Sequence, residues 1–105
     1  AEDEQFSGQS LLSLFTALER KNVQLGVAGK IRTPQDAEAV MNAGVDWVML
    51  GRAAMLECDF PNKYVNDRNF KPVEMPVPSS YLTAQGLSDK FQVYVRGRWP
   101  EFFAD

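Results

Sequence analysis

The chain has 105 residues, of which 45% are apolar and 24% charged, and its formal net charge is −3 at pH 7. This length is sufficient for one small domain with a buried core. Because the basic residues are scattered along a chain of net negative charge, nothing favours a nucleic acid or a membrane surface as partner. No apolar run approaches the length of a membrane span, and no secretory segment is recognisable.

The sequence contains no histidine and a single cysteine, Cys58. The commonest general base is therefore missing, as are the residues for an internal disulfide or a multi-cysteine metal site. A free thiol is typical of the reducing cytoplasm, where we expect the protein to reside. Because the sequence starts with Ala1 rather than Met, we expect it to be a fragment of a longer protein.

The first half alternates helical and strand patterns after an acidic, irregular lead-in over residues 1–8. Apolar residues recur at three- and four-residue spacing over residues 9–20, which predicts an amphipathic helix with basic residues near its C-terminal end. Short apolar runs over residues 23–28 and 45–50 predict two strands buried on both faces, as in parallel sheets.

A second helix is predicted between these two strands. Thr33 can cap its start, Pro34 suits the first helical position, and Asp36 places a negative charge in the first turn. Gly44 can end the helix in the left-handed conformation, and a third helix is expected over residues 53–57. This order of elements, with short connections, indicates parallel strands joined by right-handed crossovers.

Prolines become frequent from Pro61 onward, and this composition predicts an extended tail. One further helix is expected over residues 88–96, with Phe91 and Val95 on one face, before Gly97 ends it.

Two strand ends carry the residues that are best suited to bind a ligand. Ala28, Gly29 and Lys30 end the first strand, and Gly51 and Arg52 follow the second. Ligands of parallel α/β sheets bind at the carboxyl ends of the strands. A glycine lets the backbone approach a phosphate closely. The N–H groups of residues 52–54, at the start of the expected helix, would face an anion. The guanidinium of Arg52 can form charge-assisted hydrogen bonds to a phosphate. The pattern therefore predicts a phosphate site.

Each of these residues also has a purely structural interpretation. Gly29 can serve only a tight turn, and Lys30 can be a solvated surface lysine. Arg52 can form an ion pair with Asp46 or Glu57 instead of binding a ligand.

The stretch VAGKIRTPQDAEAVMNAGVDWVMLGRAAM, residues 27–55, resembles the region around the seventh and eighth barrel strands of old yellow enzyme-like NADH:flavin oxidoreductases. That pattern has a glycine, Thr-Pro, an Ala-Glu helix, Ala-Gly, an Asp-containing strand and Gly-Arg. Residues 59–63 and 76–103 are similar to the family as well. The resemblance implies an α/β fold that is part of a TIM (β/α)8 barrel. Residues 1–60 would form its C-terminal quarter, and residues 61–105 a tail on the barrel or on a partner subunit.

Members of this family bind FMN and pass hydride from NAD(P)H to an activated alkene or carbonyl substrate. The resemblance implies that Ala28, Gly29, Lys30, Gly51 and Arg52 hold the phosphate and ribityl end of FMN. The family's substrate-binding His/His or His/Asn pair, its proton-donating Tyr and the basic residue near the flavin come from earlier strands. We therefore expect no catalytic residue in this chain. The single cysteine fits the short branch that lacks an iron–sulfur cluster.

The run Tyr-Val-Arg-Gly-Arg-Trp near the end of the chain suggests one further hypothesis. Some short-branch relatives end in a similar Arg-Gly-Trp run that reaches into the active site of a neighbouring subunit, a role that would fall to Arg96 or Arg98. The alternative is an amphipathic tail anchored by four aromatic residues: Phe91, Trp99, Phe102 and Phe103.

Two strands alone are marginal in water, and their outer edges present unpaired backbone groups. We therefore expect the isolated chain to form a homo-oligomer through its strand edges or its tail, to bind FMN weakly and to show no turnover. Two other interpretations stay open: a fragment of another phosphate-binding TIM-barrel enzyme, or a small α/β interaction module without enzymatic activity.

Overall fold

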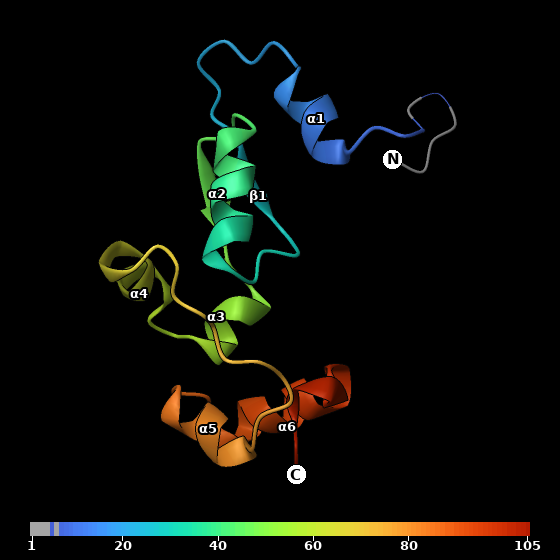
Figure 1. The fold of residues 1–105 in the computed structure, drawn as a ribbon. Coiled ribbons are helices and arrows are strands. Elements are labelled where there is room, and N and C mark those ends of the chain that lie inside the picture. Colours follow the sequence, from blue (N-terminus) through green and yellow to red (C-terminus); the bar gives the residue numbers. More distant parts are fainter. Residues whose placement is uncertain (1–4, 6) are drawn as a thin grey trace.

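A computed structural model describes Gln5 and residues 7–105, so the lead-in predicted over residues 1–8 lies partly outside the described residues. Within the described part, six α-helices, a short 3-10 helix and a two-stranded parallel sheet make a mixed α/β fold (Figure 1). The elements are α1 (Leu11–Thr16), β1 (Gly26–Ala28), α2 (Pro34–Asn42), β2 (Trp47–Met49), α3 (Arg52–Leu56), α4 (Phe60–Asn66), α5 (Ser79–Ala84), α6 (Asp89–Arg98) and η2 (Pro100–Phe102).

The two strands run parallel and pair in register, with Ala28 opposite Met49. Two hydrogen bonds fix this register at the start of the strands. The N–H of Leu25 donates to the carboxylate of Asp46 at 2.7 Å, and the N–H of Asp46 donates to the carbonyl of Leu25 at 2.8 Å. The predicted parallel pair is thus confirmed, and both strands end at the same edge of the sheet.

The strands are shorter and more exposed than their apolar composition predicts. Each has three residues, and the expectation that both faces are buried is wrong. Val48 is half-buried on the side of α2, whereas its neighbours Trp47 and Met49 are 44% and 49% exposed. Side chains alternate between the faces of a strand, and in the described part of the chain only the α2 side is covered.

The exposed face of the sheet is partly shielded by the indole of Trp47. A Cβ atom added to Gly26 would lie only 2.0 Å from Trp47 Nε1. The ring therefore lies across β1 in the space that the missing side chain of Gly26 leaves free.

The first helix, α1, forms only the middle of the segment predicted over residues 9–20. Ser10 caps it by accepting the N–H of Ser13 at 3.0 Å. Leu11 and Phe15 stay 62% and 51% exposed, so the apolar stripe of the helix is not buried within the chain. Short helices without such packing are marginal in water, which accounts for the six residues observed.

The start of α2 confirms the predicted capping signals. The Thr33 hydroxyl accepts the N–H of Asp36 at 3.1 Å, and the Asp36 carboxylate accepts the N–H groups of Thr33 and Arg32 at 3.2 and 3.1 Å. The hydrogen bond from the Arg32 backbone is the main reason that the pKa of Asp36 is lowered. Pro34 occupies the first turn, and Gly44 follows the helix with a φ of 108°.

The second half of the chain is folded, so the predicted extended tail is wrong. Pro61 lies in the first turn of α4, and Pro78 directly precedes α5. Proline disrupts a helix interior but is favourable at a helix start, where its missing N–H is not needed. The last predicted helix exists as α6, but it continues through Gly97 to Arg98.

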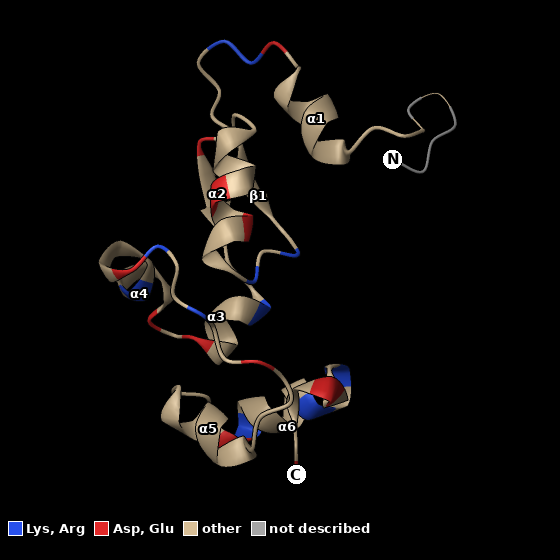
Figure 2. Ribbon diagram, in the orientation of Figure 1, with Lys and Arg blue, Asp and Glu red and all other residues tan. Residues whose placement is uncertain are grey.

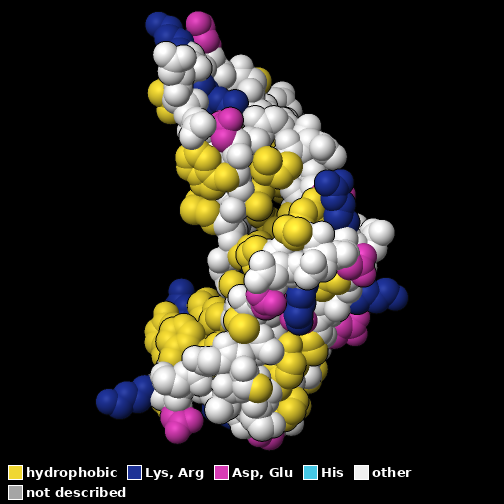
Figure 3. All heavy atoms as spheres, turned by 90° about the vertical axis from the view of Figure 1, so that its left-hand side faces the viewer, with side chains coloured by type: hydrophobic (Ala, Val, Ile, Leu, Met, Phe, Trp, Pro, Cys, Tyr) yellow, Lys and Arg dark blue, Asp and Glu magenta, His cyan; other side chains and the backbone are white. Residues whose placement is uncertain are grey.

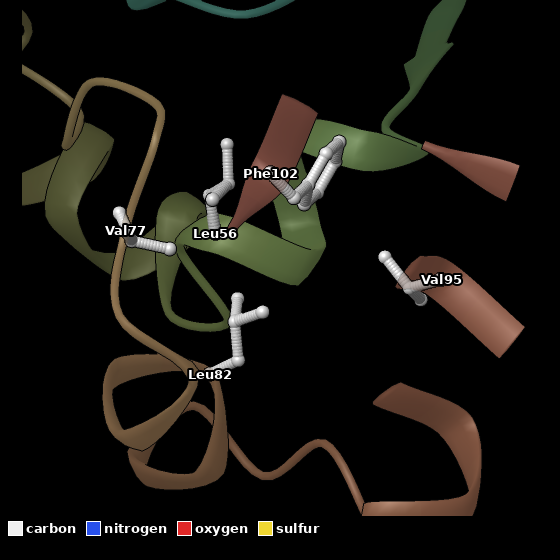
Figure 4. Close-up of a cluster of buried hydrophobic side chains, with 5 residues drawn as sticks. All are labelled: Leu56, Val77, Leu82, Val95 and Phe102. Carbon is white, nitrogen blue, oxygen red and sulfur yellow. The ribbon is translucent and has the colours of Figure 1, made fainter. Parts of the chain in front are cut away.

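The hydrophobic core lies in this second half and not between the strands. Five buried side chains from α3, α5, α6, η2 and the segment before α5 point toward one another (Figure 4): Leu56, Val77, Leu82, Val95 and Phe102. Two backbone hydrogen bonds join the segments beside this cluster. The N–H of Val77 donates to the carbonyl of Phe102, and the N–H of Ala104 donates to the carbonyl of Val77, both at 2.8 Å. The C-terminal segment is therefore tied back onto the chain.

Phe91 does not share the buried face of α6 with Val95. Phe91 is 42% exposed, whereas Gln92 is buried. The Gln92 amide donates to Thr83 Oγ1 at 2.9 Å and to the carbonyl of Leu87 at 3.0 Å, so its burial leaves the amide nitrogen satisfied.

The molecule as a whole is extended. Its radius of gyration is 16.5 Å, compared with about 13 Å for a compact domain of this length. Its accessible surface is 7553 Å², where a compact chain of this size exposes roughly 5,900 Å². Hydrophobic side chains gather at the surface in several places (Figure 3). None of the described helices has the length and apolar character needed to cross a lipid bilayer.

Candidate phosphate-binding site

The two predicted strand ends lie side by side. Because Ala28 pairs with Met49 in a parallel ladder, the residues that follow each strand leave the sheet at the same edge. We call this group the strand-end site and define it by five residues: Ala28, Gly29, Lys30, Gly51 and Arg52.

The turn after β1 has an unusual backbone. Gly29 has a φ of 111° and Lys30 a φ of 58°; the first value lies in a region that glycine adopts freely and other residues avoid. A tight turn is thus present, as the structural interpretation of Gly29 predicted. Apart from its two chain neighbours, no residue in the described part of the chain has an atom within 4 Å of the position that a Cβ on Gly29 would occupy, so the turn also has free space beside its backbone.

Arg52 is half-buried at the start of α3 and does not form the ion pair that the sequence left open. The carboxylate of Asp46 accepts a backbone N–H before β1, and Glu57 pairs with Lys63. The guanidinium carbon of Arg52 instead lies 5.5 Å from the centroid of the Trp99 ring. Sequence reasoning placed Trp99 only among the anchors of the tail and missed this contact.

The N-terminus of α3 contributes less than the sequence suggested. The helix has five residues, and the N–H of Ala54 donates to the carbonyl of Gly51 at 3.0 Å. This donor is therefore engaged within the chain. The Arg52 side chain is left as the main source of positive charge on the β2 side of the strand-end site.

A third basic residue, Arg32, belongs to the same loop as Lys30 and was not singled out from the sequence. Figure 2 shows basic residues in the loop between β1 and α2 and at the start of α3. Arg32 Nη1 lies 3.7 Å from the sulfur of Met75, which is a weak acceptor. With Lys30 and Arg52, it gives the segments that follow the two strands three basic residues, an arrangement that favours an anionic ligand.

Two cavities lie near the sheet. One of about 380 Å³ runs along β1 between α1 and α2 and includes Ala28 and Gly29 in its wall. The other, of about 830 Å³, is an apolar groove between α2, β2, α3 and α4. Two polar residues in its wall are joined by a hydrogen bond, in which the hydroxyl of Tyr64 on α4 donates to Glu38 on α2 at 2.8 Å. This bond raises the pKa of Tyr64. Both volumes fall in the range of small-molecule sites.

The two arginines of the C-terminal run differ in their surroundings. Arg96 is held by its own chain: Nη1 donates to the main-chain oxygen of Asp105 at 2.6 Å, and the guanidinium carbon lies 3.9 Å from the Phe103 ring centroid. Arg98 is exposed and, among Gln5 and residues 7–105, has neither a hydrogen bond nor an ion pair. Arg98 is therefore the better placed of the two to contact another molecule.

No protein-family model matches the chain, and no solved structure matches it at a significant level. In the part of the chain that the structure describes, no three His, Cys, Asp or Glu residues are grouped so as to hold a metal ion.

Proposed function

We propose that this chain is the C-terminal quarter of an FMN-binding TIM barrel of the old yellow enzyme type, and that its strand-end site binds the phosphate of FMN. One observation carries the proposal. The in-register parallel pairing of β1 and β2 brings Gly29 and the Gly51–Arg52 corner to the same carboxyl edge. Phosphate sites of TIM barrels lie in the loops after the last two strands, at this end of the barrel.

The arrangement around the sheet supports the same proposal. The order α1, β1, α2, β2, α3 is that of consecutive βα units, and α2 covers one face of the sheet, as the outer helices of a barrel do. Trp47 and Met49 lie exposed on the opposite face, which would be the barrel interior. In a closed barrel, further strands would pair with both outer edges of the sheet.

The residues of the site fit a phosphate dianion. The Arg52 guanidinium can donate two parallel N–H bonds to phosphate oxygens, Lys30 adds a second positive charge, and Gly29 leaves room for the phosphate beside the backbone. The flavin, when bound, supplies the redox chemistry. NAD(P)H and an activated alkene or carbonyl would be the substrates of the whole barrel, and we expect no turnover from this chain alone.

Comparison of FMN with riboflavin, which lacks the phosphate, tests the proposal by equilibrium titration. We expect FMN to bind at least about tenfold more tightly, because charge-assisted hydrogen bonds contribute about 1.5–3 kcal/mol. Arg52→Ala should remove most of this difference. Arg68→Ala is the matched control, since Arg68 is exposed on the segment after α4 and outside the strand-end site.

Three results would contradict the proposal in different ways. Equal affinities for FMN and riboflavin would exclude recognition of the flavin phosphate. Inorganic phosphate binding as tightly as FMN would favour another phosphate-binding barrel. No binding of any phosphate would favour the non-enzymatic interaction module.

We also propose that the chain associates with itself through its uncovered surfaces. The exposed face of the sheet, with Trp47 and Met49, and the exposed rings of Phe91 and Tyr94 on α6 supply the apolar contact area. Light scattering is expected to give a mass above that of one chain, and a stable monomer at micromolar concentration would disprove this.

A further inference from the structure

The side chain of Arg52 connects the strand-end site to the C-terminal segment. Its guanidinium carbon lies 5.5 Å from the centroid of the Trp99 ring, within the range of about 6 Å over which a cation and an aromatic face attract each other. Across Gln5 and residues 7–105, the Arg52 guanidinium forms no hydrogen bond and no ion pair. Trp99 is therefore the partner that restrains its charged end.

Trp99 itself is firmly held. Its backbone N–H donates to the carbonyl of Val95 at 2.7 Å, and its ring packs partly buried against the hydrophobic core. The ring centroids of Phe102 and Tyr94 lie 6.2 and 6.3 Å away. Contacts on several sides leave the indole few alternative rotamers, so the ring is a fixed surface for the arginine.

We propose that Trp99 is a positioning residue for Arg52, which makes phosphate affinity at the strand-end site depend on the folded C-terminal segment. This inference rests on the proposed function of that site. An arginine loses side-chain entropy when it is immobilised by a ligand. Contact with a rigid ring has already removed part of that freedom, so less is lost when the phosphate binds.

The contact with Trp99 restrains the Arg52 side chain but leaves its N–H donors free to bind a phosphate. A cation–π contact uses the face of the aromatic ring and the positive charge, whereas the N–H donors of the guanidinium lie in its own plane. The Trp99 ring carries no net charge, so it neither neutralises the arginine nor replaces a phosphate oxygen. A carboxylate in the same place would do both.

The test measures the affinities of three Trp99 forms for FMN, with riboflavin as the reference without phosphate. Trp99→Leu, which keeps an apolar side chain but removes the ring, should weaken FMN binding by about three- to tenfold and leave riboflavin unchanged. Trp99→Phe should restore part of the loss. Phe91→Leu removes an exposed ring of α6 that stacks on Tyr94, and it should have no effect.

Two further measurements separate positioning from a merely structural role. The NMR signals of the Arg52 side chain should show a ring-current shift that is lost in Trp99→Leu and partly kept in Trp99→Phe. If Trp99→Leu does not fold, fluorinated tryptophan in a Trp47→Phe background keeps the ring shape and weakens its negative face. FMN affinity should then fall as fluorine is added, and an unchanged affinity would overturn the inference.

The outcomes for the site and for the positioning residue are distinguishable. If Arg52→Ala weakens FMN binding but Trp99→Leu in a folded chain does not, the inference fails and the phosphate site stands. If Arg52→Ala itself leaves FMN binding unchanged, the proposed function fails first. Non-additive losses in the Arg52→Ala, Trp99→Leu double variant would support the coupling.

Discussion

Replacing Phe102 with Ala is expected to lower the free energy of unfolding by about 3–5 kcal/mol, the usual cost of deleting a buried phenyl ring. Phe102 is fully buried and joins side chains from α3, α5 and α6. Its carbonyl also accepts the N–H of Val77. Because the chain has so little other buried apolar area, a loss of this size should unfold the C-terminal half under native conditions.

Urea unfolding followed by circular dichroism measures this loss, and in a Trp47→Phe background the fluorescence of Trp99, which packs on Phe102, reports it locally. Phe91→Ala is the matched control, because the same ring is removed from a site that is 42% exposed. Its cost should stay below about 1 kcal/mol. Equal losses for the two variants would show that the buried cluster does not dominate stability.

Glu57→Ala is the second change for which we expect a large effect, about 2–3 kcal/mol, because hydrogen bonds of buried charged groups contribute strongly. The Glu57 side chain is 5% exposed, pairs with Lys63 and accepts the N–H of Val73 at 2.8 Å. It thereby connects α3 with α4 and with the segment that leads to α5. Removing the Glu57 carboxylate leaves the Val73 N–H without an acceptor. The ammonium group of Lys63 can be hydrated instead, because this side chain is 44% exposed.

Chemical denaturation of a small series tests this assignment. Glu57→Gln keeps an acceptor for the N–H of Val73. Its free energy of unfolding should therefore fall by about half as much as that of Glu57→Ala. Glu74→Ala, at an exposed carboxylate outside this network, should cost less than about 0.5 kcal/mol. A loss at Glu57 no greater than that at Glu74 would mean that the buried carboxylate is dispensable.

The features that could be predicted from the sequence are those encoded locally. Thr33, Pro34 and Asp36 define the start of α2 because a cap and its partners lie within three residues of one another. The parallel pairing followed from the alternation of elements, and with it the meeting of the strand ends at one edge of the sheet.

The features that could not be predicted depend on contacts between distant parts of the chain. The frequency of prolines from Pro61 onward predicts an extended tail, although the same residue type also favours helix starts, and only the packing decides between the two roles. The exposure of Trp47 depends on what covers the sheet, which no local pattern encodes. The contact of Arg52 with Trp99 likewise arises only once the C-terminal segment has folded back.

The placement of the Trp47 indole over Gly26 has a consequence for any polypeptide that arrives at the uncovered side of the sheet. Such a polypeptide contacts the indole first, so it must either pack on the ring or rotate it away from Gly26. Where the incoming chain packs on the ring, the indole passes from water into an apolar environment, which shifts tryptophan emission to shorter wavelength. Trp47 is thus an intrinsic optical reporter on the uncovered face of the sheet.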